Sequence, residues 1–200
     1  EVTGPEVVNY LLDATIPTTP ALPPPGLLGM LDRGLSGFSI GGYSGSLGNN
    51  WPTDQAALQA LQPLYADYAT ALRQKGWLNR HYLYTYDEPQ PGLAHVAKVA
   101  AMVHAADPAL KNLVVLHSAP NVSALTDWFS DIDIVCQRNV TFDPAQMDLL
   151  KQLGKEVWFY VSGPSPPYPT LVIDYPAMAA RILPWMAWKY GLKGLLFWTT

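Results

Sequence analysis

The stretch Tyr82-Leu83-Tyr84-Thr85-Tyr86-Asp87-Glu88-Pro89 joins a strand-like run to two adjacent acids and a proline. Large aromatic and apolar side chains favour a β-strand, and the proline ends it because proline has no N–H for the ladder. Adjacent carboxylates repel each other, which favours protonation of one of them and gives a site both a proton donor and an anion. Two acids also suit the start of a following helix, where the helix dipole favours negative charge. This strand end is therefore a candidate active site.

The composition is that of a globular domain with few charges. Hydrophobic residues make up 49% and charged residues 14% of the 200 residues, which allows a substantial core. The net charge of -4, without a cluster of Lys and Arg, argues against a nucleic-acid partner. No apolar run reaches the roughly 18 residues needed for a membrane span. Cys136, the single cysteine, lies in an apolar run and is expected to be a buried structural thiol.

Strand-like apolar runs alternate with amphipathic segments along most of the chain. The predicted strands are residues 36–43, 82–88, 112–118, 132–137, 157–162 and 194–199. The predicted helices are residues 53–75 with Thr53 as N-cap, 92–106, 122–128, 144–153 with Asp143 as N-cap, and 175–190. Strands separated by helices pair in parallel through right-handed crossovers, so the sequence predicts an α/β fold.

Polar or aromatic residues end every predicted strand, which is how a (β/α)8 barrel builds its site. These residues are Tyr43, Asp87, Glu88, His117, Ser118, Gln137, Arg138, Tyr160, Ser162 and Trp198. The alternative is an open doubly wound sheet, but residues 41–45 lack the spacing of a dinucleotide-binding fingerprint. The sequence therefore predicts a TIM-type barrel, with residues 36–200 as a partial barrel that forms the catalytic domain. The proline-containing residues 1–35 are expected to be a connecting segment or a lid.

Three segments resemble the glycoside hydrolases of family 123 and their relatives. They are the Tyr-x-x-Asp-Glu-Pro strand end, the run Val157-Trp158-Phe159-Tyr160 with the later Tyr175-Pro176 and Arg181–Gly191, and the end Gly194-Leu195-Leu196-Phe197-Trp198. The likeness covers about residues 78–200. In that family the barrel carries an Asp-Glu pair at its fourth strand, as in the family 20 hexosaminidases, which cleave terminal 2-acetamido sugars with retention. The resemblance implies a hexosaminidase-like hydrolase with a carbohydrate substrate, such as a β-N-acetylgalactosaminide.

Carried over to this chain, the resemblance makes Glu88 the general acid/base. Asp87 would orient and stabilise the acetamido group, the internal nucleophile, as it closes to an oxazolinium ion. If these acids end the fourth strand, the strands after them are five to eight, and the last one ends at Trp198. Strands one and two are then expected upstream of Glu1, as barrel strands or an N-terminal domain of a longer protein.

The residues also favour a mechanism that uses this pair of acids alone. An ordinary retaining glycosidase needs a second carboxylate about 5 Å from the first. No other acid stands at a predicted strand end, since Asp131 and Asp133 start a strand and Asp143 begins a helix. One difficulty is that consecutive strand residues point to opposite faces. Both acids reach one sugar only if the strand breaks at Asp87.

Further strand-end side chains are candidate substrate ligands. They are Tyr43, Tyr86, His117, Arg138, Tyr160 and Trp198. Tyr160 is expected to hydrogen-bond the acetamido oxygen, and Arg138 to bind either a sugar hydroxyl or Asp87. The structural alternatives are that Trp198 plugs the barrel core and that His117 is a buried core histidine.

Other functions stay open at this point. The chain is also compatible with a carbohydrate-binding barrel without catalysis, or with a glycosidase for a different sugar. A metal site of His81, Asp87 and His117 is weaker, because His81 starts its strand and no His-x-His spacing exists. We expect neither a metal nor a cofactor. Trp185 and Trp188 lie within a predicted helix and are expected to pack against the outside of the barrel.

Overall fold

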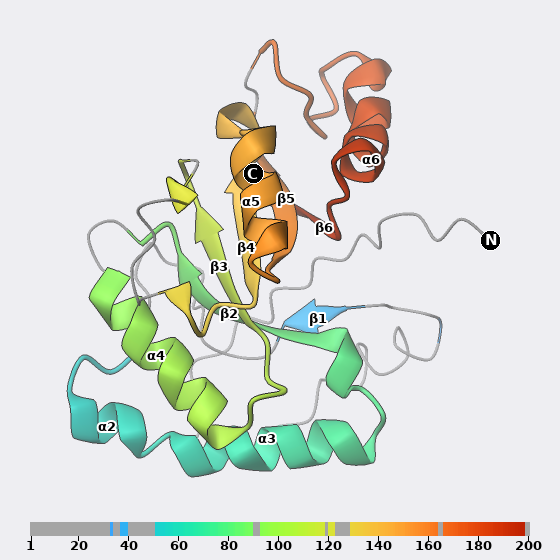
Figure 1. Cartoon of the computed structure of the whole chain (residues 1–200). Helices are drawn as coiled ribbons and strands as arrows, with labels where there is room; N and C mark the ends of the chain where they lie inside the picture. The colour runs from blue at the N-terminus through green and yellow to red at the C-terminus, as the bar shows by residue number, and fades with distance from the viewer. Residues whose placement is uncertain are drawn as a thin grey trace.

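The computed structural model describes residues 33, 37–39, 51–89, 93–118, 120–122, 129–163 and 166–198, and Figure 1 shows their arrangement. The strands are β1 Phe38–Ser39, β2 His81–Asp87, β3 Asn112–Leu116, β4 Ile134–Arg138, β5 Glu156–Ser162 and β6 Gly194–Trp198. The α-helices are α2 Gln55–Gln59, α3 Gln62–Gln74, α4 Leu93–Ala106, α5 Pro144–Gln152 and α6 Ala177–Tyr190, with short 3-10 turns at Leu78–Arg80 and Asn139–Thr141. The predicted N-terminal segment 1–35, apart from Arg33, and most of the predicted helix 122–128 lie outside the described residues.

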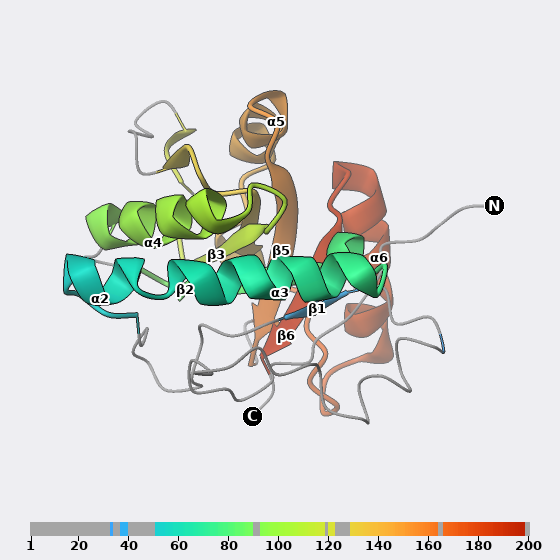
Figure 2. The same cartoon turned by 90° about the horizontal axis from the view of Figure 1, so that it is seen from below.

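The described strands form one six-stranded sheet whose order follows the chain, β1-β2-β3-β4-β5-β6. Every neighbouring pair is parallel. A doubly wound sheet instead reverses its strand order at a switch point and carries helices on both faces. Here the helices lie outside the strands, as Figure 2 shows from below. The predicted partial (β/α) barrel is therefore confirmed, and the open-sheet alternative is wrong.

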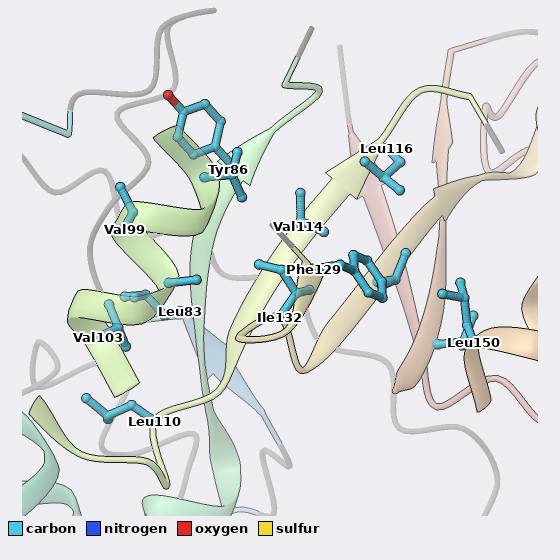
Figure 3. Packing of buried hydrophobic residues seen from close by; sticks show 14 of the residues in the cluster. Leu83, Tyr86, Val99, Val103, Leu110, Val114, Leu116, Phe129, Ile132 and Leu150 are labelled. Carbon is cyan, nitrogen blue, oxygen red and sulfur yellow. The ribbon is translucent and has the colours of Figure 1, made fainter. Parts of the chain in front are cut away.

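The buried side chains form two groups, one on each face of the sheet. One group, the helix-side core, includes residues of the helices and the strand side chains that face them, among them Leu83, Val99, Val103 and Val114 (Figure 3). The other group, the inner-face cluster, contains strand residues alone: Tyr82, Tyr84, Leu113, Val115, Ile134, Cys136, Tyr160 and Leu196. Because this second group contains no helix residue, it marks the concave side of the half-barrel. The prediction that Cys136 is buried is confirmed, since it is 0% exposed.

The helices begin and end largely for local reasons. Asp143 caps α5 as predicted, and its carboxylate accepts hydrogen bonds from Ala145 N and Gln146 N. The predicted single helix 53–75 is wrong, because two helices occupy it and Asp54, not Thr53, caps the first. Pro63 explains the break, since it has no N–H to continue the ladder of the preceding turn. At the other end of the chain, Gly191 closes α6 in a left-handed conformation with φ 63°.

Helix α6 leaves two large aromatic side chains on the surface. Trp185 is 66% and Trp188 67% exposed, and their rings meet edge to face. The expectation that they pack against the barrel is therefore wrong, since the buried side chains of α6 are Leu183 and Ala187. Across the described residues, each helix falls short of the length and apolar character that crossing a bilayer requires.

The end of the sheet opposite the acids is held by a histidine between two carboxylates. His104 Nε2 lies 3.0 Å from Asp133 Oδ2, and His104 Nδ1 lies 3.1 Å from Asp131 Oδ1. Asp133 Oδ2 also accepts a 2.7 Å hydrogen bond from the backbone N–H of Asn112. Asp131 and Asp133 are turned toward α4 by these contacts. Strand β4 begins at Ile134, two residues later than the predicted start at 132.

This histidine predicts a pH dependence of stability. The hydrogen bond to Asp133, supported by Asp131, raises the pKa of His104 above its ordinary value of 6.5. The imidazolium form is thus favoured by folding, and its stabilisation is complete below pH 6.5 and lost as the pH rises through the raised pKa. We expect the difference in Tm between wild type and His104→Gln to be largest near pH 6 and to shrink toward pH 8.5. A difference that stays constant over this range would contradict the ion pair.

A glycine at the start of β6 makes room for a tryptophan on the inner face. A Cβ added to Gly194 would lie 2.6 Å from Trp158 Cε2 and Cε3, far inside van der Waals contact. The Trp158 ring is fixed, because its Nε1 donates a 2.7 Å hydrogen bond to Glu156 Oε1 and it packs edge to face with Tyr82 at a centroid distance of 5.0 Å. We expect Gly194→Ala to lower the free energy of unfolding by about 1–3 kcal/mol, through overpacking. Urea denaturation measures this loss, and Gly37→Ala, where an added Cβ would come no closer than 3.6 Å to Arg80 O, is the control for a glycine that has room.

Candidate active site

Strand β2 carries one extra residue relative to its neighbour β3. The register shifts between Tyr84 and Tyr86, so Thr85 has no partner across the ladder. An extra residue of this kind is a β-bulge, and it reverses the alternation of side chains along the strand. Tyr84 therefore belongs to the inner-face cluster, whereas Tyr86 belongs to the helix-side core and lies beside α4 (Figure 3).

The bulge directs Asp87 toward the inner face of the sheet. Asp87 pairs with Val115, which is a member of the inner-face cluster. The hydroxyl of Tyr84 donates a 2.9 Å hydrogen bond to Asp87 Oδ1. This hydrogen bond ties the carboxylate to a side chain of the inner-face cluster and so fixes its direction.

Glu88 lies on the same side because the backbone turns sharply at this residue. Its φ of 41° is the one positive value of a non-glycine residue in the described part of the chain. Such a conformation costs roughly 1–2 kcal/mol, and strained residues of this kind cluster at active sites. The N–H of Glu88 still donates to Val115 O at 3.0 Å, so the turn occurs while the residue is tied to β3. The strand therefore breaks just after Asp87, and this break answers the difficulty that neighbouring strand residues point apart.

Tyr160 of β5 reaches Glu88 from across the concave side. Its hydroxyl donates a hydrogen bond to Glu88 Oε1. Burial, then the hydrogen bond and charge of Glu88, raise the pKa of Tyr160, and the charge of Arg138 opposes this rise. Tyr160 therefore remains a protonated donor at neutral pH. A contact between the end of β2 and β5 shows that the two acids stand at the open mouth of the half-barrel.

An arginine and a histidine flank the acids. Arg138 Nη1 lies 2.6 Å from His117 Nε2, and the ring nitrogen is the acceptor because a guanidinium only donates. His117 and Glu88 line a cleft of about 250 Å³ together with Pro89 and Leu116. Because His117 is exposed, the alternative of a buried core histidine is wrong. The cleft is thus lined by a carboxylate and by an imidazole that is hydrogen-bonded to an arginine.

The other described strand ends offer no third carboxylate. Strands β3, β4, β5 and β6 end at Leu116, Arg138, Ser162 and Trp198. Asp131 and Asp133 stand at the far end of the sheet beside His104. His81, at the start of β2, bonds Leu78 O and the backbone N–H of Lys111. Within the residues that the structure describes, no three His, Cys, Asp or Glu side chains are grouped so as to hold a metal ion.

The structure brings together most, but not all, of the residues that the sequence singled out. Asp87, Glu88 and Tyr160 meet, with His117 and Arg138 beside them. Tyr86 is separated from them: it is 9% exposed, and its ring meets that of His95 at 5.9 Å on the helix side. The physical reason is the bulge, which turns Tyr86 away from the concave face. Tyr43 and the side chain of Trp198 lie outside the described residues.

Sequence reasoning missed the residues that set the direction of the acids. The sequence predicts Tyr84 only as a strand residue, yet its hydroxyl donates a hydrogen bond to Asp87. Thr85, 0% exposed, is the bulged residue. The one local signal for the bulge is Thr85 itself, a polar residue inside an aromatic strand, because a buried polar group needs a hydrogen-bond partner.

Comparisons with known proteins bear on the family and the fold of the chain. Residues 47–200 match the profile of the glycoside hydrolase 123 catalytic domain. A solved family 123 glycoside hydrolase from Clostridium perfringens, studied for glycolipid glycan hydrolysis, superposes with a TM-score of 0.55 at 14% identity over 76% of this chain. The chain spans 26% of that enzyme's length. No curated protein matches the chain.

Two further solved structures share the fold. Fungal β-1,4-galactanases superpose with a TM-score of 0.53 at 16% identity, over 86% of this chain and 71% of theirs. The GH53 catalytic domain from Ignisphaera aggregans gives a TM-score of 0.51 at 12% identity, over 86% and 65%. At such identities the likeness concerns the barrel alone, whereas the profile match covers more than half of the sequence. The chain therefore belongs to glycoside hydrolase family 123.

Proposed function

We propose that the protein containing this chain is a glycoside hydrolase that cleaves a terminal 2-acetamido sugar with retention. The proposed substrate is a β-N-acetylgalactosaminide or a related sugar, and the acetamido group of the substrate acts as the nucleophile. One observation carries the proposal: two adjacent carboxylates, Asp87 and Glu88, share one side of a strand end, each held by a tyrosine. Because β3 to β6 end without another acid, a carboxylate nucleophile on the opposite side of the sugar is missing from the described strand ends.

Glu88 is the proposed general acid and base. It donates a proton to the glycosidic oxygen as the bond to the anomeric carbon breaks, and then takes a proton from the water that opens the intermediate. Tyr160 holds the carboxylate of Glu88 in place for this transfer. In the free protein its hydroxyl is engaged by Glu88, so a hydrogen bond to the acetamido oxygen requires Tyr160 to shift from Glu88 to the substrate.

Asp87 is the proposed partner of the acetamido group. The carbonyl oxygen of that group attacks the anomeric carbon, and positive charge develops on its N–H as the oxazolinium ring closes. A carboxylate that accepts this N–H stabilises the charge where it develops. The bond from Tyr84 fixes Asp87 before the substrate arrives, so little reorganisation is needed during the reaction.

The remaining ligands of the sugar are proposed from their place in the cleft. His117 presents an imidazole to the cleft and Arg138 fixes that imidazole, so the pair is suited to sugar hydroxyls. Trp198 remains a proposal for the floor or wall of the sugar site, and Tyr43 for its entrance. We also propose that the full-length protein closes the barrel with two further strands, because the six strands among the described residues form a sheet that runs in order from β1 to β6 without pairing these two.

The test measures hydrolysis of three chromogenic sugars by the full-length protein: a β-N-acetylgalactosaminide, a β-N-acetylglucosaminide and a plain β-galactoside. We expect cleavage of an acetamido sugar only, with the β-anomer as the first product in a proton NMR time course. Cleavage of the plain galactoside would overturn the substrate-assisted mechanism, because it requires another nucleophile. Binding of a glycan without turnover of any sugar would favour a carbohydrate-binding barrel instead.

A further inference from the structure

The β-bulge at Thr85 is held by hydrogen bonds that come from two distant parts of the chain. We propose that Trp51, Thr85 and Asn112 are positioning residues that set the direction of Asp87 and Glu88. This inference rests on the proposed function, because it concerns the same two acids. The hydrogen bonds of these three residues go to one another, to the backbone and to other side chains than the two acids. Each residue therefore acts on the acids through the backbone of β2.

The side chain of Thr85 is fastened to β3. Thr85 Oγ1 lies 2.8 Å from Asn112 Oδ1 and 3.2 Å from Leu83 O, and both Thr85 and Asn112 are 0% exposed. Asn112 is oriented by its own amide, which donates to Ala100 O at 3.3 Å and to Asp131 O at 3.0 Å. Because its NH2 group is used in this way, Asn112 presents its oxygen to Thr85. The bulged side chain therefore has a single fixed partner across the sheet.

The backbone of Thr85 is fastened by Trp51. The indole Nε1 of Trp51 donates a 2.7 Å hydrogen bond to Thr85 O across 34 residues of sequence. Trp51 is 3% exposed, and its ring packs against that of Tyr65 at a centroid distance of 5.7 Å. The carbonyl of a bulged residue lies outside the regular ladder, so without this donor it would be a buried acceptor with an unmet hydrogen bond. The indole thus favours the bulged conformation of β2 over a regular one.

The conformation of the bulge decides which residues face the concave side. With Thr85 as an extra residue, Tyr86 faces α4 and Asp87 faces the inner-face cluster. In a regular strand the alternation would continue, and Asp87 would face the helices while Tyr86 faced inward. A displacement of only about 1 Å of a catalytic group costs up to 10²-fold in rate. Loss of the bulge would therefore disable the acids although neither has been changed.

The test compares Trp51→Phe and Thr85→Val with a control from the same core. Tyr65→Phe removes a buried hydroxyl that has no hydrogen-bond partner, on helix α3 next to Trp51. Each full-length variant is assayed on two aryl glycosides of the sugar that wild type cleaves, one with a phenyl and one with a dinitrophenyl leaving group. The fraction of folded protein is measured at the assay temperature. The phenyl glycoside needs the proton from Glu88, whereas the dinitrophenyl glycoside departs without it.

We expect Trp51→Phe and Thr85→Val to lower kcat/KM on the phenyl glycoside by about 10²-fold, and more than on the dinitrophenyl glycoside. Tyr65→Phe should remain within about twofold of wild type on both. Losses that are equal on both substrates and match the loss of folded protein would overturn the proposal, as would variants that behave like Tyr65→Phe.

A crystal structure of Thr85→Val separates this inference from the proposed function. If wild type cleaves no aryl glycoside, the proposed function fails, and the direction of Asp87 in the variant then decides the inference. A regular β2 with Asp87 turned toward α4 would support it. A retained bulge, with Tyr84 still bonded to Asp87, would overturn it.

Discussion

Replacing Glu88 with glutamine is expected to lower kcat/KM on a phenyl 2-acetamido glycoside by about 10³-fold, within the range that general acid catalysis contributes. Glutamine keeps the shape of the side chain and a polar oxygen for Tyr160, but it has no proton to give to the glycosidic oxygen. The loss should therefore depend on the leaving group. On a dinitrophenyl glycoside, which departs without protonation, the first step should recover most of its rate in a pre-steady-state burst.

Glu156→Gln is the matched control for this variant. It makes the same chemical change at the other end of the sheet, where Glu156 pairs with Lys111 at 3.2 Å and accepts from Trp158. Its kcat/KM should remain within a few-fold of wild type, because a partly exposed ion pair contributes little beyond about 1 kcal/mol to stability. A Glu88→Gln enzyme as active as this control would remove Glu88 from the mechanism.

Asp87→Asn is expected to lower kcat/KM by about 10²–10³-fold, as loss of one electrostatic partner of the transition state does. The physical reason differs from that for Glu88. Asparagine offers no negative charge to the acetamido N–H as the oxazolinium ring forms, so the loss should be similar for phenyl and dinitrophenyl glycosides. Binding of a cyclic thiazoline, which resembles the oxazolinium ion, should weaken by a comparable factor in a competition assay.

Asp143→Asn serves as the control for Asp87→Asn. Asp143 is an acid that follows β4, and asparagine caps a helix about as well as aspartate does. Activity and thiazoline affinity should both stay near those of wild type. If Asp87→Asn lost activity only on the phenyl glycoside, Asp87 would take part in proton transfer, and the proposal that it accepts the acetamido N–H would be wrong.

The strands and their order follow from patterns that are local in the sequence. The apolar runs that become β3, β4 and β5 are short, are bounded by polar residues and alternate with helices, and this rhythm leaves few topologies. The N-cap of α5 is also local, because Asp143 precedes the helix directly. The break between α2 and α3 also has a local cause, because Pro63 lies at the start of α3. The prediction of a single helix did not take this proline into account.

The direction of the two acids was not predictable from the strand itself. The bulge depends on the register with β3 and on hydrogen-bond partners 34 and 27 residues away: Trp51, which donates, and Asn112, which accepts. The left-handed backbone of Glu88 is similarly hidden, because glutamate is not a residue that favours that conformation. The surface position of Trp185 and Trp188 was missed for a related reason: their apolar character says nothing about which side of α6 the sheet occupies.

The buried thiol of Cys136 makes the stability of the sheet beneath the acids directly measurable. Burial, and then the charge of Asp87, raises the pKa of Cys136, so in the folded protein the thiol is both shielded and protonated. An aromatic disulfide reagent can react only after the side chains that cover Cys136 on the inner face move apart. Because this is the sole cysteine of the 200 residues, the labelling rate reports a single opening event. Wild type and the variants of Thr85 and Gly194 can then be ranked by how often the inner face opens, without any substrate.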